Sequence, residues 1–442
     1  LLERSKNKTL IDMKKYLYCF LLLALPQLLF TQELYFPPSN SMDWDTLAPE
    51  ALNYCPEKIE ALYQFLEAEQ SKSFLLLKDG KIVLEQYFGT FTQDSLWFWF
   101  SAGKGLRAVL VGIAQEQGFL DINDPTSDYL GSGWTSMTPE QELLITPWHQ
   151  LTMTSSLNPI DFTCTDPSCL TYLQDAGSFW VYHNSPYNLL RNVLESATGV
   201  NINVLTNNWI RNKIGMNSGF WLPSGDNTFF LSRARDMARF GLLVQNRGNW
   251  DGTTILGDTA YLDQMLNTSQ SLNLSYGYLW WLNGKDSYIP PGSLLTFSGY
   301  LAPDAPADIV TAAGGQGQYI SISPGSGLMM IRQGLSEDED RAAIELLNAI
   351  WEKILDLECM TTSVSEQQTE SIQITPNPVS DWLQVQGLRV PMSEIWLYDV
   401  NGQLKGTWTN QSTISLQAQA PGVYYLRIKN GDEYLTKKLV KT

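Results

Sequence analysis

The chain has 442 residues, of which 44% are hydrophobic and 17% charged, and it contains 15 Trp, 20 Tyr and 17 Phe. This amount of apolar material excludes a wholly disordered chain and predicts at least one large core within two or three structural units. The net charge of −17 argues against nucleic-acid binding, which relies on a basic surface.

The first 32 residues are typical of an export signal with a short extension before it. The first methionine is Met13, so we interpret residues 1–12 as lying upstream of the start. Two lysines and an apolar run over 16–30 follow, and this run is shorter than the roughly 20 residues that a spanning helix needs. We therefore expect signal cleavage, export through the periplasm and no stable membrane span.

Four cysteines remain after the signal, and an oxidising compartment would allow them to pair. Four cysteines allow three pairings. The turn-prone residues between Cys164 and Cys169 make a local bridge geometrically easy, and Cys55 and Cys359 would then join the two ends of one domain. The alternative is four free, buried thiols, since the spacing fits no zinc site.

Hydrophobic patterns over 33–360 predict strands near both ends of one large domain, with mostly helices and loops between them. Two apolar runs over 74–88 flank Asp79-Gly80, which is a strong hairpin signal. Two further strand-like runs lie within 319–334. Helical spacing of apolar residues or a continuous buried pattern predicts helices over 105–118, 233–245 and 340–356.

The C-terminal part of the chain has a different texture. Residues 361–370 are polar and lack periodicity, which predicts a linker. Residues 371–442 contain short β-type runs separated by turn dipeptides, which predicts a small all-β sandwich. From residue 365 onward acidic and basic residues balance at seven each, so the negative charge belongs to the preceding domain.

Ser101 and Lys104 form an S-x-x-K motif at the start of the helix predicted over 105–118. A spacing of three places both side chains on one face, where the amine can reach the hydroxyl. A serine hydroxyl is a poor nucleophile until a base takes its proton, and a lysine is such a base only when its amine is neutral. The motif by itself is common, and Ser5 and Lys8 form another.

Tyr182 and Asn184 are the only Tyr-x-Asn pair in the chain. A phenol beside a lysine can relay a proton to a leaving group, and an amide can hold both the lysine and a substrate carbonyl. The alternative is a tyrosine packed in a loop. With only His149 and His183 present, a three-histidine zinc site is excluded, and we expect no metal or other cofactor.

Residues 313–319 are glycine-rich and lead into a predicted strand. Glycines allow a backbone to approach a substrate closely, and a backbone N–H here would complete an oxyanion hole with that of Ser101. A phosphate-binding loop is a poor interpretation, because no Gly-Lys-Ser/Thr follows. The alternative is an ordinary hairpin turn.

In this order and spacing the three segments resemble the serine hydrolase family of class C β-lactamases, D-Ala-D-Ala peptidases and esterases, which includes 6-aminohexanoate-dimer hydrolases. The resemblance extends over roughly residues 70–355. It implies an α/β fold in which an antiparallel sheet flanked by helices adjoins an all-helical region. Four further segments carry the resemblance: 120–130, 151–157, 232–241 and 276–281.

The resemblance also assigns roles to residues. Ser101 is the acylating nucleophile, Lys104 the general base and Tyr182 the proton shuttle, while Asn184 contacts the lysine and the substrate. The oxyanion hole would consist of the backbone N–H groups of Ser101 and Gln318.

Two departures from the family pattern are informative. Gly315, Gln316 and Gly317, which are expected to contact substrate, stand where β-lactamases have Lys/His-Thr/Ser-Gly, so the cation that grips a β-lactam carboxylate is missing. His183 should point away from its two neighbours in a structural role. The loop over 158–180 and three tryptophans are expected to give an aromatic-lined site: Trp99, Trp280 and Trp281.

The last domain resembles the type IX secretion sorting domain, which implies that the export machinery recognises residues 371–442. A carbohydrate-binding sandwich is the alternative, although no exposed aromatic row is evident. The similarity lies in the segments 375–378, 397–402, 421–426 and 437–441.

Together these patterns predict a secreted or cell-surface serine hydrolase that cleaves a small-molecule ester, amide or peptide through an acyl-enzyme. The competing interpretation is a non-catalytic penicillin-binding or peptidoglycan-sensing protein of the same fold. The presence of Ser101, Lys104 and Tyr182 together argues against it, because a decayed site would usually have lost one of the three.

Overall fold

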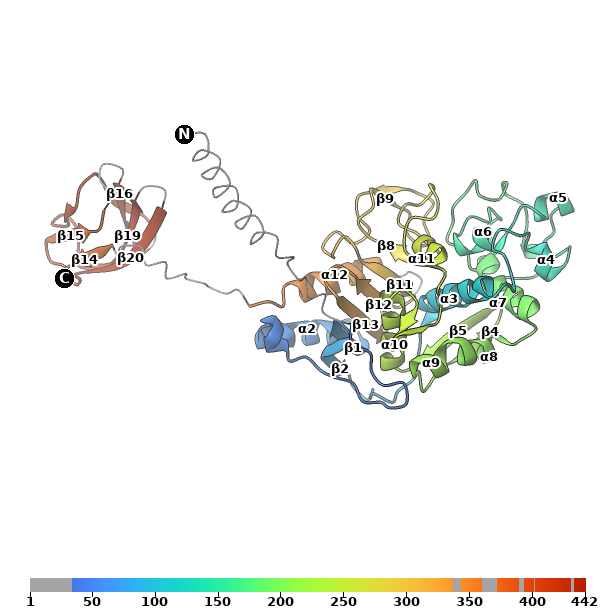
Figure 1. The fold of residues 1–442 in the computed structure, drawn as a ribbon. Coiled ribbons are helices and arrows are strands. Elements are labelled where there is room, and N and C mark those ends of the chain that lie inside the picture. Colours follow the sequence, from blue (N-terminus) through green and yellow to red (C-terminus); the bar gives the residue numbers. More distant parts are fainter. Residues whose placement is uncertain (1–33, 337–342, 360–371, 389–392, 401, 431–432) are drawn as a thin grey trace, which may run out of the picture. The chain divides into compact units, whose positions relative to one another are not determined.

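The computed structural model describes residues 34–336, 343–359, 372–388, 393–400, 402–430 and 433–442 (Figure 1). It divides the chain into two compact units, with the boundary after Cys359. The predicted signal peptide over 1–32 and the linker over 361–370 lie outside the described residues. In the part that is described, no helix is both long and apolar enough to cross a membrane.

The first unit mixes helices and strands along the chain. Its helical elements are η1 (Pro49–Leu52), α2 (Pro56–Ala68), η2 (Phe100–Ala102), α3 (Gly103–Glu116), α4 (Ser127–Leu130), α5 (Pro139–Glu142), α6 (Pro147–Leu151), η3 (Pro167–Cys169), α7 (Asn184–Thr198), α8 (Ile202–Thr206), η4 (Asn207–Arg211), α9 (Asn212–Ile214), α10 (Ala234–Gln245), α11 (Thr259–Met265) and α12 (Ile344–Leu355). Its strands are β1 (Ser71–Lys78), β2 (Lys81–Tyr87), β3 (Trp97–Phe98), β4 (Phe220–Ser224), β5 (Asn227–Ser232), β6 (Asn249–Trp250), β7 (Thr253–Thr254), β8 (Trp281–Leu282), β9 (Ser287–Tyr288), β10 (Phe297–Ser298), β11 (Val310–Gly314), β12 (Gln318–Ser323) and β13 (Leu328–Gly334).

A six-stranded antiparallel sheet, in the order β2-β1-β13-β12-β11-β8, forms the centre of this unit. A Cβ added at Gly241 of α10 would lie 3.0 Å from Ile320 of β12, so Ile320 faces α10. The next residue, Ser321, accepts a hydrogen bond of 2.9 Å from Nε1 of Trp351 on α12. Because successive side chains of a strand point to opposite faces, α10 and α12 cover opposite faces of the sheet.

Most of the elements predicted from the sequence are present. The hairpin around Asp79-Gly80 joins β1 to β2, and these two residues have φ angles of 48° and 86°, as a two-residue hairpin turn requires. The helices predicted over 105–118 and 233–245 are α3 and α10. The two strand-like runs within 319–334 are β12 and β13, and α12 occupies the described part of the helix predicted over 340–356.

The region predicted to be all-helical differs in one respect, because it includes a small three-stranded sheet in the order β3-β5-β4. Strands β4 and β5 form a local hairpin, but β3 pairs with β5 across more than 120 residues, and no local pattern predicts that pairing. Helix α3 is buried from Gly103 to Ala114 and contacts both α7 and β11. The start of α3 is therefore fixed between the helical region and the large sheet.

The second unit is built from two antiparallel sheets, which agrees with the predicted all-β domain. One sheet has the order β14-β15-β18 and the other β17-β16-β19-β20. Alternate residues of β15 are buried, and eleven buried apolar or aromatic residues form one core. The strands are β14 (Gln373–Thr375), β15 (Trp382–Gln386), β16 (Ser393–Asp399), β17 (Leu404–Thr409), β18 (Thr413–Ser415), β19 (Gly422–Asn430) and β20 (Glu433–Lys441).

Both predicted disulfides are present. Cys164 is bonded to Cys169, and Cys55 is bonded to Cys359 across a sequence separation of 304 residues. The long-range bond joins the start of α2 to the residues after α12, which pack on each other. It therefore links the two ends of the first unit.

We predict that the paired substitutions Cys55→Ser and Cys359→Ser lower the free energy of unfolding of the first unit more than removal of the Cys164–Cys169 bond does. In the chain-entropy model the long loop contributes on the order of 5 kcal/mol and the short loop about 2 kcal/mol. Urea unfolding followed by tryptophan fluorescence measures both. Equal losses for the two double variants would contradict this expectation.

Candidate active site

Ser101 lies in the short helix η2, immediately before α3, and is half-buried. The preceding residue, Phe100, has a φ of 45°, which is unusual for a residue with a side chain and makes a sharp turn into the helix. Trp99 secures this turn, because its backbone N–H donates to Phe230 and its indole donates to Ser232 Oγ at 2.8 Å. The serine is therefore presented by a fixed backbone.

The lysine predicted to act as base reaches the serine. Lys104 Nζ lies 3.1 Å from Ser101 Oγ and donates at 2.8 Å to Asn184 Oδ1, the first residue of α7. The amine also lies 4.0 Å from the ring centroid of Tyr187 and 5.1 Å from that of Tyr182. Residues 80 positions apart in the sequence thus meet around one amine.

Burial favours the neutral form of this lysine. Its side chain is within α3 and almost inaccessible to solvent. Loss of water around the amine lowers the pKa of Lys104 well below its usual value, and the positive charge of Arg107 lowers it further. A neutral amine hydrogen-bonded to Asn184 and next to Ser101 is able to accept the serine proton.

Tyr182, whose ring centroid lies 5.1 Å from the Lys104 amine, is held by two other aromatic rings. Its ring stacks on Trp281 with centroids 5.8 Å apart and meets the edge of Tyr276 at 6.4 Å. Burial raises the pKa of the phenol, and the nearby Ser101 hydroxyl opposes this increase. The phenol is therefore protonated at neutral pH and available as a donor beside Ser101 and Lys104.

The glycine-rich segment reaches the serine through Gly314, at the end of β11. A Cβ added at Gly314 would lie 2.3 Å from the carbonyl oxygen of Trp99 and 3.1 Å from the backbone nitrogen of Ser101. Only glycine fits there, because any side chain would displace the backbone that presents the serine. Gly314 was not among the residues predicted to contact substrate, although the three glycines within 314–317 marked this segment.

The placement of Gln318 does not fit its predicted role as an oxyanion donor. It begins β12, which lies between β11 and β13, so its backbone N–H points to a neighbouring strand. Its side chain is fully buried and bonds to Gly334 and to the carbonyls of Gly315 and Gln316. The contact between β11 and η2 joins segments distant in the sequence, so local patterns did not indicate that β11 packs against Ser101.

Hydrogen bonds from Arg332 fix the turn between β11 and β12. Gly315 and Gln316 are half-buried, while Gly317 is buried. The buried guanidinium of Arg332 donates to the carbonyl oxygens of Gln316 and Gly317 at 3.0 and 2.6 Å. The Arg332 cation binds backbone carbonyls. It therefore does not replace the Lys or His that binds a β-lactam carboxylate in β-lactamases and is missing from this turn.

The two histidines have contacts away from the serine. His183 Nε2 lies 3.2 Å from the carbonyl oxygen of Asp161, and its ring stacks on Phe162. His149 belongs to a capping box with Thr146 at the start of α6. Burial lowers the pKa of each histidine to about 4. Both are neutral at pH 7 and both have local structural contacts.

Of the three tryptophans expected to line the site, only Trp281 makes a ring contact with a predicted site residue. Trp281 stacks on Tyr182, as described above, whereas Trp99 and Trp280 are fully buried in the core and do not line the site. A Cβ at Gly105 would lie 2.9 Å from the Trp280 ring, so that ring packs behind α3. No motif in the sequence marked Tyr187, although its ring centroid lies 4.0 Å from the Lys104 amine.

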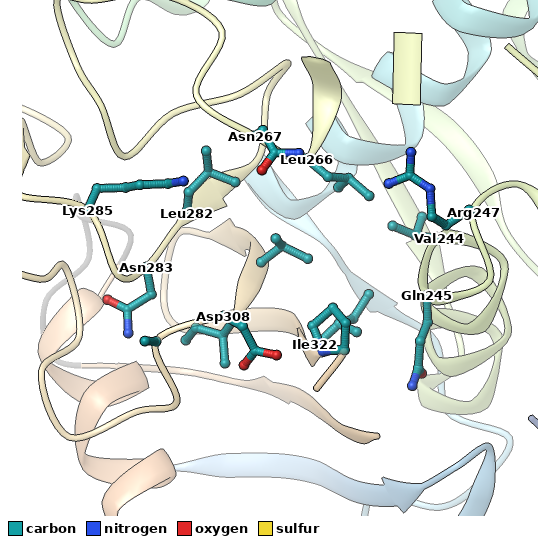
Figure 2. A pocket seen from close by; sticks show the side chains of 14 residues that line it. Val244, Gln245, Arg247, Leu266, Asn267, Leu282, Asn283, Lys285, Asp308 and Ile322 are labelled. Atoms are coloured by element: carbon teal, nitrogen blue, oxygen red, sulfur yellow. The ribbon is translucent and has the colours of Figure 1, made fainter. Parts of the chain in front are cut away.

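A cavity of about 370 Å³ lies away from Ser101 (Figure 2). It is lined by Val310 at the start of β11 and by Ile322 near the end of β12, whereas the serine lies near the end of β11. Figure 2 shows Lys285 extending toward Leu282 at its edge. The cavity is therefore at the opposite ends of the strands and is not part of the site.

Two family models match parts of this chain. The family model described as Beta-lactamase matches residues 64–346, and the model described as Secretion system C-terminal sorting domain matches residues 373–442. Among curated protein sequences there is no significant match.

Two solved structures show the likeness in fold. One is from Bacillus anthracis and provisionally described as a 6-aminohexanoate-dimer hydrolase, with a TM-score of 0.55, 15% identity, and coverage of 74% of this chain and 89% of that chain. The other is from Bacteroides dorei DSM 17855 and provisionally described as a beta-lactamase, with a TM-score of 0.55, 15% identity, and coverage of 69% and 99% respectively.

We predict that Gly314→Ala slows phosphonylation of Ser101 by a serine-directed fluorophosphonate at least about tenfold, because the added methyl group cannot fit against the Trp99 carbonyl. Gly103→Ala is the matched control, since a Cβ there meets its nearest atom at 3.5 Å within a helix. Time-resolved intact-mass measurement follows the labelling. Equal rates for the two variants would contradict the close packing of Gly314.

Proposed function

The chain belongs to the Beta-lactamase family, and on that premise we propose that it is a serine hydrolase that cleaves an ester or amide bond through an acyl-enzyme on Ser101. The observation that carries the proposal is the contact of Ser101 Oγ with a buried lysine amine at 3.1 Å. Asn184 fixes that amine at 2.8 Å, so the base and the nucleophile are already aligned.

The reaction would begin with attack of Ser101 Oγ on the substrate carbonyl while neutral Lys104 accepts the hydroxyl proton. Tyr182 then passes a proton to the leaving alcohol or amine as the bond to it breaks, and Lys104 restores the phenol proton. Water hydrolyses the acyl-serine by the reverse proton path and releases the acid. The neutral amine and the protonated phenol are the states that this sequence requires at the start.

The oxyanion would be held by two backbone N–H groups, those of Ser101 and Gly315. Gly314, the last residue of β11, pairs with Gln318, the first residue of β12. Gly315 directly follows Gly314, whose Cβ position lies 3.1 Å from the backbone nitrogen of Ser101, and this closeness supports Gly315 as the second donor. This assignment keeps Gly315 among the substrate contacts and replaces Gln318 as donor.

The surroundings of the serine favour an apolar acyl group. Phe100, which precedes Ser101 in the chain, forms a half-buried cluster with Phe98 and Phe229, with ring centroids 5.5 to 6.5 Å apart. The segment over 310–318 contains no Lys, Arg or His that would bind a substrate carboxylate. An uncharged ester or amide therefore fits better than a β-lactam.

The chain also carries a secretion-system C-terminal sorting domain, which implies secretion or display at the cell surface. We propose that the type IX machinery recognises this domain after signal cleavage and passage through the periplasm. The same fold in a non-catalytic penicillin-binding or peptidoglycan-sensing protein remains the competing function, and the experiments below separate the two.

We predict that Ser101→Ala abolishes ester turnover, by roughly a thousandfold or more, and also removes labelling by a fluorophosphonate. Lys104→Ala should be nearly as damaging, because the two residues act as one unit and their effects do not add. Burst kinetics with a p-nitrophenyl ester measure acylation, and circular dichroism checks the fold.

Ser95→Ala, at a half-buried loop serine, controls for background labelling. Undiminished labelling of Ser101→Ala would identify another nucleophile. An intact wild-type protein that neither turns over nor is acylated would favour the sensing function.

We predict that the protein hydrolyses nitrocefin poorly compared with a short-chain p-nitrophenyl ester. A charge-assisted hydrogen bond to a carboxylate contributes about 1.5–3 kcal/mol, so its absence lowers affinity for the lactam roughly 10–150-fold. The ratio of kcat/KM for the two substrates measures this. Efficient nitrocefin turnover would show that another group binds the carboxylate.

A further inference from the structure

Arg107 lies one turn after Lys104 on α3 and is fully buried. Its guanidinium is near two aromatic rings, 4.4 Å from the centroid of Tyr187 and 4.8 Å from that of Trp221. Its hydrogen bond to the Tyr187 carbonyl is long, at 3.4 Å. Among the described residues, Nε and Nη2 have no hydrogen-bond partner and no carboxylate forms an ion pair with this cation. Burying a charge in this way is costly.

Two other buried arginines show what a structural role looks like in the same unit. Arg239 donates to four backbone carbonyls, and Arg332 donates to four carbonyls and to Ser71 Oγ. Arg239 and Arg332 each hold separate chain segments together through several hydrogen bonds. Arg107 does not, so anchoring does not account for a charged residue at its position.

The proximity of Lys104, the proposed base, accounts better for a buried charge at Arg107. The Lys104 amine and the Arg107 guanidinium both lie close to the Tyr187 ring, at 4.0 and 4.4 Å from its centroid. Two like charges that share one buried ring repel each other, and guanidinium is the one that stays charged. The uncharged Asn184 amide is the hydrogen-bonding partner of Lys104, and the rings of Tyr182 and Tyr187 are also neutral.

Other charged groups near Arg107 come from α7. Arg191 and Glu195 are 3.8 Å apart and affect Arg107 in opposite directions. Burial raises the pKa of Tyr182 and Tyr187, which keeps both phenols neutral. Arg107 is thus the charged group that acts on Lys104, and burial and Arg107 both favour the neutral amine.

We propose that Arg107 is a positioning residue that holds Lys104 in its neutral, proton-accepting form and fixes Tyr187 beneath the amine. This inference rests on the proposed function, since it assigns Lys104 as the base. Arg107 does not contact the substrate; its unpaired charge acts through the lysine. The cost of burying that charge would then maintain the base in the form that the reaction needs.

The test is the pH dependence of acylation, because a merely structural change would lower the rate equally at all pH values. Activity requires neutral Lys104 and is lost as pH falls through its pKa. Removal of the neighbouring cation raises that pKa, so the acid limb should move to higher pH by about one unit or more. At a pH on that limb the rate then falls about tenfold and recovers at alkaline pH.

Arg107→Gln and Arg107→Met provide two neutral replacements, of which Gln can still donate to the Tyr187 carbonyl. Arg107→Lys retains the charge and should keep the acid limb near that of the wild type. Arg191→Met removes a cation of α7 that does not contact Lys104, so it is the matched control and should leave the limb in place. Burst rates with a p-nitrophenyl ester between pH 5 and 10 supply the profiles.

The outcomes separate the two proposals. If Ser101→Ala keeps the wild-type rate, the proposed function is wrong. If the rate depends on Ser101 but folded Arg107→Gln or Arg107→Met retains the wild-type acid limb, only the role of Arg107 is wrong. The same conclusion follows if Arg107→Lys shifts the limb as far as the neutral variants do.

Discussion

The arrangement of this unit depends on one constraint: a lysine amine must be removed from water and yet remain within reach of a half-buried serine. Helix α3 meets it by being buried over most of its length, with the sheet on one side and α7 on another. Asn184 supplies the oxygen that satisfies the amine without adding a charge. A carboxylate in the same place would favour the ammonium form and remove the base.

Close packing around α3 maintains this position, and glycines on and opposite the helix make it possible. Cβ atoms at Gly105 and Gly112 would lie 2.9 and 2.6 Å from the rings of Trp280 and Tyr261, and Gly314 similarly admits the backbone that precedes α3. Large rings fill the space that the absent side chains leave, which gives the helix a single position. The abundance of aromatic residues in the sequence thus has a role in fixing the site as well as in forming the core.

The sequence predicted the parts of the site that local spacing determines. Ser101 and Lys104 are three residues apart on a helix, so their contact followed from helical geometry, and the family resemblance brought Tyr182 and Asn184 to them. The position of Gln318 does not fit the predicted donor role, because the contact between η2 and β11 joins segments distant in the sequence and no local pattern predicts it. Trp99 and Trp280 were misassigned because local sequence does not tell which face of an aromatic-rich segment is buried.

Nothing in the sequence marked Arg107. An arginine in an apolar helix usually extends its charged end to solvent, and the sequence does not show whether a given one is buried instead. Its burial with no carboxylate partner among the described residues is visible only in three dimensions. Three departures from ordinary protein architecture occur within eight residues: the positive φ of Phe100, the buried amine of Lys104 and the unpaired guanidinium of Arg107. Each costs stability, and the surrounding close-packed core supports them together. Such costs concentrate where function requires them. Here all three lie around the Lys104 amine, whose protonation state the proposed reaction depends on.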